Sequence, residues 1–135
     1  MIDIYTDGAT KGHNGKLGTV TEVGIGIYIP AFGEGVGRKT NGISNNEAEF
    51  KALIAGMRLA QALNIKQARF KLDSQIVVNR ANGARPKKAK FKNERMYAFQ
   101  DTVFELKKNF TKVEFQWIPR EENDMADMYS KECLL

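Results

Sequence analysis

Acidic residues stand at points in this sequence where they could bind divalent cations. Asp7 follows the alternating apolar run that begins at Ile2, and Asp73 follows a second such run that ends at Leu72. If these two strands are parallel neighbours, both carboxylates emerge at the same edge of the sheet. Mg²⁺ prefers oxygen ligands, and a pair of metal ions can activate water and stabilise the leaving oxygen when a phosphodiester is hydrolysed. The sequence therefore predicts a hydrolytic metal site at this edge.

Two further pairs of acids lie on predicted helices. Glu47 and Glu49 are separated by about 200° around a helix, so they face opposite ways. We expect Glu49, beside the apolar stripe that includes Leu53, to face the sheet, and Glu47 to face solvent. Asp124 and Asp127 share one face of the last helix, so spacing leaves either one as a site residue. Single acids of this kind usually form turns or stabilise helix ends, so the prediction depends on the whole set.

Apolar periodicity predicts the elements that position these acids. Alternating residues indicate strands at about 2–6, 23–29, 33–42, 68–73 and 113–117. Helical spacing indicates helices at about 44–63, 74–82, 96–110 and 122–131. The first three strands follow one another directly, and helices separate the others. This order predicts an α/β fold, with a five-stranded mixed sheet that is flanked by helices and whose first three strands are antiparallel.

Length and composition favour one domain that spans residues 1–135. A chain of 135 residues can bury a sizeable core but is short for two independent domains. Its content of 42% hydrophobic and 27% charged residues is typical of soluble globular proteins, and no apolar run is long enough to span a membrane. The single cysteine, Cys133, cannot form an internal disulfide. We expect a soluble, cytoplasmic monomer without a membrane partner.

Positive charge is concentrated in one segment of the chain. The net charge is +5, and the residues from 80 to 95 include Arg80, Arg85, Lys87, Lys88, Lys90, Lys92 and Arg95, opposed only by Glu94. Such a cluster favours contact between its lysines and the phosphates of a polyanionic partner, and it predicts salt-sensitive binding. The alternative is a solvated surface loop.

Four short motifs give the acids a family context. They are Tyr5-Thr6-Asp7-Gly8-Ala9, Asn45-Asn46-Glu47-Ala48-Glu49, Leu72-Asp73-Ser74-Gln75 and Glu122-Asn123-Asp124-Met125-Ala126-Asp127. In order and spacing they resemble the acidic motifs of type 1 ribonucleases H. The resemblance implies a ribonuclease H-like fold and an endonuclease that cuts the RNA strand of RNA–DNA hybrids with two Mg²⁺ ions, or Mn²⁺, leaving 3′-hydroxyl and 5′-phosphate ends. It assigns metal binding to Asp7, Glu49, Asp73 and Asp127, and selects Asp127 over Asp124.

The same resemblance implies substrate contacts. Gly8, Asn45, Asn46 and Gln75 match positions that read the minor groove of the hybrid, including RNA 2′-hydroxyls. Asn45 is equally suited to cap the helix that follows it. We expect Lys87, Lys88 and Lys90 to contact phosphates of the DNA strand.

The sequence departs from well-known bacterial members of this family in two places. The segment Trp117–Glu122 has no histidine before the last helix, so we expect Arg120 or Glu121 to substitute for it. The basic segment between Gly83 and Lys92 is shorter than the basic handle of some relatives. His13 is the only histidine, and we expect it to have no catalytic role.

Two alternative functions remain open from the sequence. The missing loop histidine suggests a module that binds hybrids with little catalysis, although all four acids are present. A nuclease of the same fold that acts on DNA is the other alternative.

Overall fold

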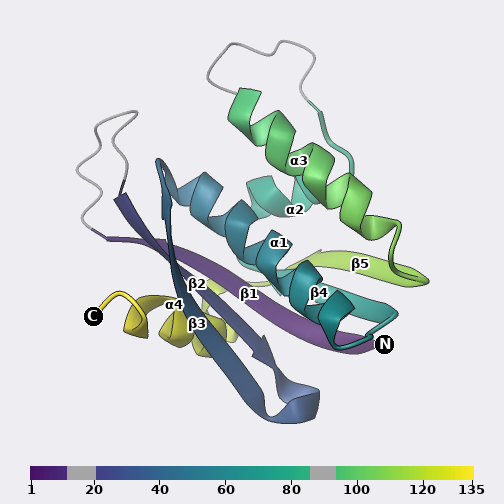
Figure 1. Cartoon of the computed structure of the whole chain (residues 1–135), viewed down its shortest axis with the longest axis horizontal. Helices are drawn as coiled ribbons and strands as arrows, with labels where there is room; N and C mark the ends of the chain where they lie inside the picture. Colours follow the sequence, from purple (N-terminus) through teal and green to yellow (C-terminus); the bar gives the residue numbers. More distant parts are fainter. Residues whose placement is uncertain (12–20, 86–93) are drawn as a thin grey trace.

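A five-stranded mixed sheet forms the centre of the structure, a computed structural model that describes residues 1–11, 21–85 and 94–135 (Figure 1). The strands are β1 (Ile2–Thr10), β2 (Thr21–Ile29), β3 (Glu34–Gly42), β4 (Gln67–Leu72) and β5 (Lys112–Trp117), in the spatial order β3-β2-β1-β4-β5. The first three strands pair antiparallel, while β4 is parallel to both β1 and β5. The predicted mixed sheet is confirmed.

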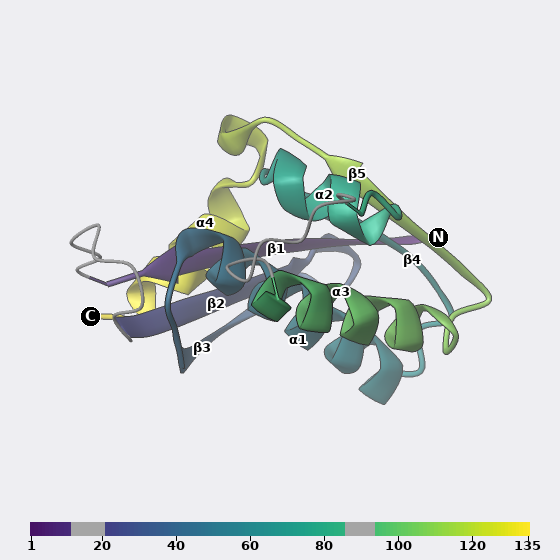
Figure 2. The same cartoon turned by 90° about the horizontal axis from the view of Figure 1, so that it is seen from above.

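Helices cover both faces of this sheet. They are α1 (Asn45–Ala62), α2 (Gln75–Ala81), α3 (Glu94–Lys107) and α4 (Asp124–Glu132), with short 3-10 turns at Pro30–Phe32 and Arg120–Glu122. Helices α1 and α2 pack on one face, and α3 packs against both of them. Helix α4 lies on the opposite side of β1 and β2 from α1 and α3 (Figure 2). The element order is the predicted one.

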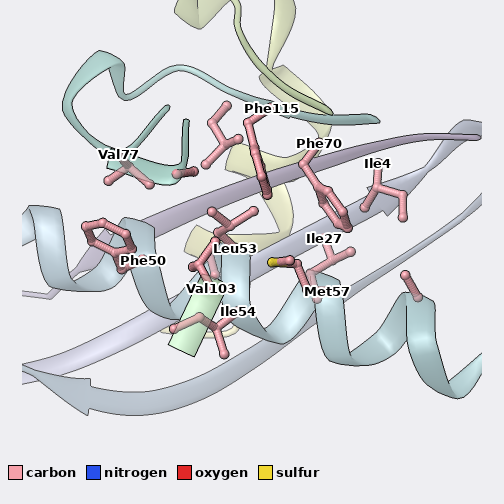
Figure 3. Close-up of a cluster of buried hydrophobic side chains, with 14 of the residues drawn as sticks. Ile4, Ile27, Phe50, Leu53, Ile54, Met57, Phe70, Val77, Val103 and Phe115 are labelled. Atoms are coloured by element: carbon pink, nitrogen blue, oxygen red, sulfur yellow. The ribbon is translucent and has the colours of Figure 1, made fainter. Parts of the chain in front are cut away.

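The main core lies between α1 and the sheet. Phe50, Leu53 and Met57 recur at helical spacing on α1, and they face Ile4 and Phe70 of the central strands (Figure 3). All five side chains are fully buried. Each large apolar side chain contributes about 1.5–3 kcal/mol when it is buried. This core therefore fixes α1, which carries Glu49, against β1, which carries Asp7.

Glycines on the other face of the sheet lie directly against α4. On β2, a Cβ added at Gly24 would lie 1.8 Å from the carbonyl oxygen of Ser130, and one at Gly26 would lie 1.9 Å from that of Ala126. Both contacts are far inside van der Waals distance and both involve backbone atoms of α4. Glycine on the strand lets the helix backbone rest directly on the sheet. Because these strand positions carry no side chain, α4 can lie close to the sheet.

Several element boundaries differ from the sequence prediction. Strand β1 continues to Thr10 instead of ending before Asp7, because its antiparallel pairing with β2 extends past the point where β4 stops. Helix α3 ends at Lys107, yet Phe110 still packs edge-on against Phe70 of the core. Helix α4 begins at Asp124, after a 3-10 turn.

A helix that crosses a membrane must be both long and apolar. Among the described residues, none of the helices is both long enough and apolar enough to cross a bilayer.

Candidate active site

The parallel pairing of β1 with β4 brings two acids to one edge of the sheet. Tyr5 pairs with Lys71. Two residues further on, Asp7 within β1 and Asp73 directly after β4 therefore lie side by side. The backbone of Asp73 is held by Trp117, whose indole Nε1 donates to its carbonyl oxygen over 3.2 Å. Asp7 lies within β1 and not at its end, and only 4% of its surface is exposed.

Glu49 reaches this edge from α1. Strand and helix approach closely here, since a Cβ on Gly8 would lie 2.3 Å from the carbonyl carbon and oxygen of Ala48. The backbone N–H of Gly8 donates to Oε1 of Glu49 over 3.2 Å and to Oδ1 of Asp7 over 3.1 Å. One peptide group therefore holds both carboxylates, and only glycine allows the approach.

The three carboxylates form a compact cluster. One oxygen atom each from Asp7, Glu49 and Asp73 can be chosen so that all lie within 4.8 Å of one another. Oε2 of Glu49 is buried and has no hydrogen-bond partner among the described residues, as expected of an atom that binds a cation. A donor set made only of carboxylate oxygens suits Mg²⁺ or Mn²⁺. The residues therefore fit the divalent cation that the sequence predicts.

Burial and mutual repulsion raise the pKa of both buried acids. The pKa of Asp7 rises to about 11, mainly through desolvation, then through Glu49, Asp127 and Asp73. The pKa of Glu49 rises to about 7, again mainly through desolvation, although the positive charge of Arg120 opposes the shift. Without a bound cation, the cluster retains a proton at neutral pH. A divalent cation would displace that proton, because a nearby positive charge favours the ionised carboxylates.

These shifts predict how pH affects the stability of the metal-free protein. A carboxyl group whose pKa is raised by folding stabilises the fold fully below its unfolded pKa, and that stabilisation is lost as the pH rises through the folded pKa. For Glu49 the loss runs from pH 4.5 to about 7, and for Asp7 it starts at pH 3.8 and continues to about 11. In urea titrations with chelator, the unfolding free energy of the wild type minus that of Asp7→Asn should fall between pH 4.5 and 8. A difference that rises with pH would contradict the raised pKa values.

Asp127 lies next to this cluster but is not one of the three. It is close enough to Asp7 to raise its pKa through a side-chain hydrogen bond. Its Oδ2 also pairs with Nζ of Lys131 over 3.0 Å, and its side chain is 31% exposed. The structure thus brings three of the four predicted acids together and sets the fourth beside Asp7.

Asn123 connects the cluster to α4. Its Nδ2 donates to the carbonyl oxygen of Thr6 over 3.0 Å and to Oδ2 of Asp73 over 3.1 Å. Two oxygen acceptors fix which end of the amide carries the NH₂ group. The backbone carbonyl of Asn123 accepts the backbone N–H of Asp127 at the start of α4. From the sequence, Asn123 was named only within a motif, and nothing in that polar stretch indicated that its side chain would be buried.

Glu47 does not face solvent, so that prediction was wrong. Its side chain is buried and forms two hydrogen bonds with the guanidinium of Arg95, the shorter being 2.6 Å. Lys51, one turn later on α1, approaches it to 3.7 Å. The geometry of the helix correctly separated Glu47 from Glu49, but α3 and the end of β3 cover the side of α1 that was expected to be open.

The arginines of the basic segment 80–95 have partners elsewhere in the fold that the sequence did not indicate. Arg80 is buried and lies over the ring of Tyr97, with 5.4 Å from Cζ to the ring centroid. Arg85 pairs with Asp101 over 2.9 Å, and Arg95 pairs with the buried acid on α1. Arg85 and Arg95 are therefore paired with acids outside this segment, which reduces the local positive charge that the sequence predicted. Lys87, Lys88, Lys90 and Lys92 lie outside the described residues.

The described residues that were predicted to contact substrate lie on three elements. Gly8 is on β1, Asn45 and Asn46 open α1, and Gln75 opens α2. Ser44, and not Asn45, caps α1, because its hydroxyl accepts the N–H of Glu47. Asn45 is exposed, and its Oδ1 accepts a hydrogen bond from the hydroxyl of Thr10 over 2.7 Å.

The loop before α4 carries the two residues expected to replace a histidine. Arg120 and Glu121 are both exposed in the 3-10 turn Arg120–Glu122. The charge of Arg120 acts on Glu49, where it lowers the pKa. The structure therefore places one of the two, Arg120, within electrostatic reach of the cluster. His13 lies outside the described residues.

Comparison with known proteins extends over almost the whole chain. Residues 7–133 match a protein family described as reverse transcriptase-like. The chain is 33% identical to EbsB of Enterococcus faecalis, and the alignment covers 99% of this chain and 94% of that protein. It is 30% identical to ribonuclease HI of Halobacterium salinarum, covering 98% of this chain but only 64% of that protein's length.

Solved structures of ribonucleases H are also similar to this chain. The crystal structure of ribonuclease H1 from Halobacterium salinarum has a TM-score of 0.79 with 25% identity, over 98% of this chain and 96% of that one. The structure of LC11 ribonuclease H1 in complex with an RNA/DNA hybrid has a TM-score of 0.67 with 26% identity, over 98% and 95% of the two chains. The chain therefore belongs to the reverse transcriptase-like family of ribonuclease H-fold enzymes, with type 1 ribonucleases H among its relatives.

Proposed function

We propose that this chain hydrolyses the RNA strand of RNA–DNA hybrids at the cluster formed by Asp7, Glu49 and Asp73. The convergence of these three carboxylates within 4.8 Å carries the proposal, because few other arrangements justify burying so much like charge. It is supported by the similarity to a ribonuclease HI and to a ribonuclease H1 that is in complex with a hybrid. We further propose that residues 1–135 act as one domain, as a monomer in the cytoplasm.

Within this proposal, each acid has its own part in holding two divalent cations. Asp7, which interacts with the three other acids, would contact both ions, while Glu49 and Asp73 would each complete one site. Asp127 would hold the ion nearer the attacking water. When bound, Mg²⁺ or Mn²⁺ would activate water and stabilise the leaving oxygen, which gives 3′-hydroxyl and 5′-phosphate ends.

The hybrid would be bound by groups around the cluster. Gly8, Asn45, Asn46 and Gln75 would contact the minor groove, where the 2′-hydroxyl distinguishes RNA from DNA. Lys87, Lys88 and Lys90 would contact phosphates. Arg120 is the better substitute for the missing loop histidine, because its charge already acts on Glu49.

A cleavage assay tests this function directly. Purified protein is incubated with an end-labelled RNA–DNA hybrid in Mg²⁺ and then in Mn²⁺, beside single-stranded RNA, double-stranded RNA and double-stranded DNA of the same sequence. We expect cleavage of the hybrid RNA alone, with products that migrate as 3′-hydroxyl fragments. Binding of the hybrid without cleavage in either metal would favour a binding module. Cleavage of DNA without hybrid cleavage would favour a DNA-directed nuclease.

Asn123→Ala is expected to weaken cleavage by positioning Asp73 less well. The substitution removes both hydrogen bonds from Nδ2, and losing such a supporting contact typically lowers metal affinity or activity by about 10- to 100-fold. We expect a higher Mg²⁺ concentration for half-maximal rate, together with a loss of about 1–3 kcal/mol in unfolding free energy.

A control separates positioning from general destabilisation. Ser130→Ala, on the next turns of α4, removes a buried hydroxyl that donates to the carbonyl oxygen of Asp127. It should lower stability without shifting the Mg²⁺ dependence. If Asn123→Ala lowers stability but leaves the Mg²⁺ dependence unchanged, Asn123 does not position Asp73.

A further inference from the structure

A groove of about 770 Å³ lies between β3, α1 and α3, and none of its lining residues belongs to the acidic cluster. Figure 1 shows α1 between β3 and α3. The hollow exists because α1 packs on β1 and β2, whereas β3, at the edge of the sheet, packs against α4 on its other face. The side of β3 that faces α1 is therefore left largely uncovered.

The floor of this groove is apolar. Ile25 and Ile27 of β2 and Ile54 of α1 line it, and each retains a few per cent of its surface exposed, from 4 to 7%. Val36 of β3 stands at its margin with 44% of its surface exposed. An exposed valine at the margin of this buried isoleucine floor offers a binding surface for an apolar side chain, because burying such a group releases about 25 cal/mol per Å².

The charged residues that line the groove are basic. Among the described residues, four basic residues line it, namely Arg38, Lys39, Lys51 and Arg58, and no acid does. Two of the four are already paired, since Lys51 approaches a buried glutamate on α1 and Lys39 approaches an acid on β2. The side chains of Arg38 and Arg58 form no ion pair or hydrogen bond with any of the described residues. The groove thus presents two guanidinium groups that have no partner in the described part of the chain, one on β3 and one on α1, beside an apolar floor.

We propose that this groove binds an acidic segment of a partner polypeptide, which inserts an apolar side chain onto the isoleucine floor and pairs its carboxylates with Arg38 and Arg58. Guanidinium groups bind carboxylates in bidentate fashion, so Arg38 on β3 and Arg58 on α1 can each hold one carboxylate of the segment. As an edge strand, β3 also offers unpaired backbone groups to an extended peptide. This inference is independent of the proposed cleavage, because the groove shares no residue with the acidic cluster.

A nucleic acid strand fits this groove less well. Such strands bind on exposed aromatic faces on which bases stack. Phe99, the one aromatic residue among the described residues that line the groove, is half-buried and already stacks on Phe50 with 6.0 Å between ring centroids. The isoleucines offer no partner for a phosphate. A polypeptide segment that carries carboxylates and an apolar side chain can contact both the isoleucine floor and the basic residues of the rim.

Binding of synthetic peptides to the full chain tests the proposal. A fluorescein-labelled peptide Glu-Glu-Leu-Phe-Glu-Glu is titrated with protein and its anisotropy is measured. Two control peptides separate the contributions, Gln-Gln-Leu-Phe-Gln-Gln without charge and Glu-Glu-Ala-Ala-Glu-Glu without the apolar pair. We expect dissociation constants of about 10–100 µM for the first peptide, as for small interfaces, and binding at least about tenfold weaker for both controls.

Variants locate the binding. The double variant Arg38→Glu with Arg58→Glu, and separately Val36→Asp, should each weaken binding about tenfold or more, because they reverse the rim charge or make the margin polar. All three side chains are exposed, so these variants should retain their thermal unfolding temperature. Lys66→Glu, also exposed and outside the groove, is the matched charge control. Equal binding by all variants, no binding by the wild type, or displacement of the peptide by oligo-dT would each overturn the proposal.

Discussion

Replacement of Asp7 by asparagine is expected to reduce hybrid cleavage about a thousandfold or more while the fold is retained. Asp7 is the acid on which Glu49, Asp73 and Asp127 all act, so it is central to any cation held there. Cations at such a site supply several kcal/mol of transition-state stabilisation, and each 1.4 kcal/mol corresponds to about tenfold in rate. Asparagine keeps the size of the side chain but removes its charge. The measurement is the single-turnover cleavage rate in Mg²⁺.

The same substitution should stabilise the metal-free protein. Desolvation is the largest cause of the raised pKa of Asp7, so a neutral amide at this position avoids a penalty that the carboxylate bears. We therefore expect the thermal unfolding temperature in chelator at pH 8 to be unchanged or higher. Asp124→Asn is the matched control, because the same chemical change is made at an exposed acid in the first turn of α4. Near-normal cleavage by Asp7→Asn would remove Asp7 from the mechanism.

Replacement of Gly26 by alanine is expected to destabilise the fold by about 3 kcal/mol, at the upper end for overpacking. The new Cβ would lie 1.9 Å from the carbonyl oxygen of Ala126 and 2.7 Å from the N–H nitrogen of Ser130. Both atoms are helix backbone, so the clash cannot be relieved by a side-chain rotation. Helix α4 must move away from the sheet as a unit. Urea unfolding at pH 7 measures the loss.

That movement should also reduce cleavage, because α4 carries Asp127. We expect the rate to fall at temperatures where Gly26→Ala is still fully folded. Gly33→Ala is the comparison, since nothing lies within 4 Å of a Cβ there and only its positive φ of 65° opposes the change. That strain amounts to about 1–2 kcal/mol and is remote from α4. Equal stability losses for the two variants would show that α4 does not rest on Gly26.

The fold was predictable from the sequence because its elements are strongly periodic. Ile25, Ile27 and Ile29 alternate in β2, and Leu53, Ile54 and Met57 follow helical spacing in α1, so both element types were assigned correctly. The end of β1 was not predictable, since a strand continues as long as it has one pairing partner, and the partner of Asp7, β2, is set by tertiary structure.

The candidate site was predictable to a similar extent. Acids at matching positions of neighbouring parallel strands lie close together, so the proximity of Asp7 and Asp73 followed once the first and fourth strands were taken as neighbours. The burial of Glu47 did not follow, because it depends on Arg95 arriving from a helix 48 positions later in the chain. The role of Asn123 was equally hidden, since an amide within a polar stretch gives no sign that it will be buried.

The contacts of Asn123 also bear on when this enzyme could become active during its own synthesis. The amide joins residues 117 and 50 positions apart, reaching back to Thr6 and to Asp73. Translation delivers β1 first and α4 much later, so a ribosome-bound chain can form the sheet before the residues that complete the acidic edge have emerged. A nascent chain is therefore expected to lack the assembled site until Asn123 and Asp127 have left the ribosome.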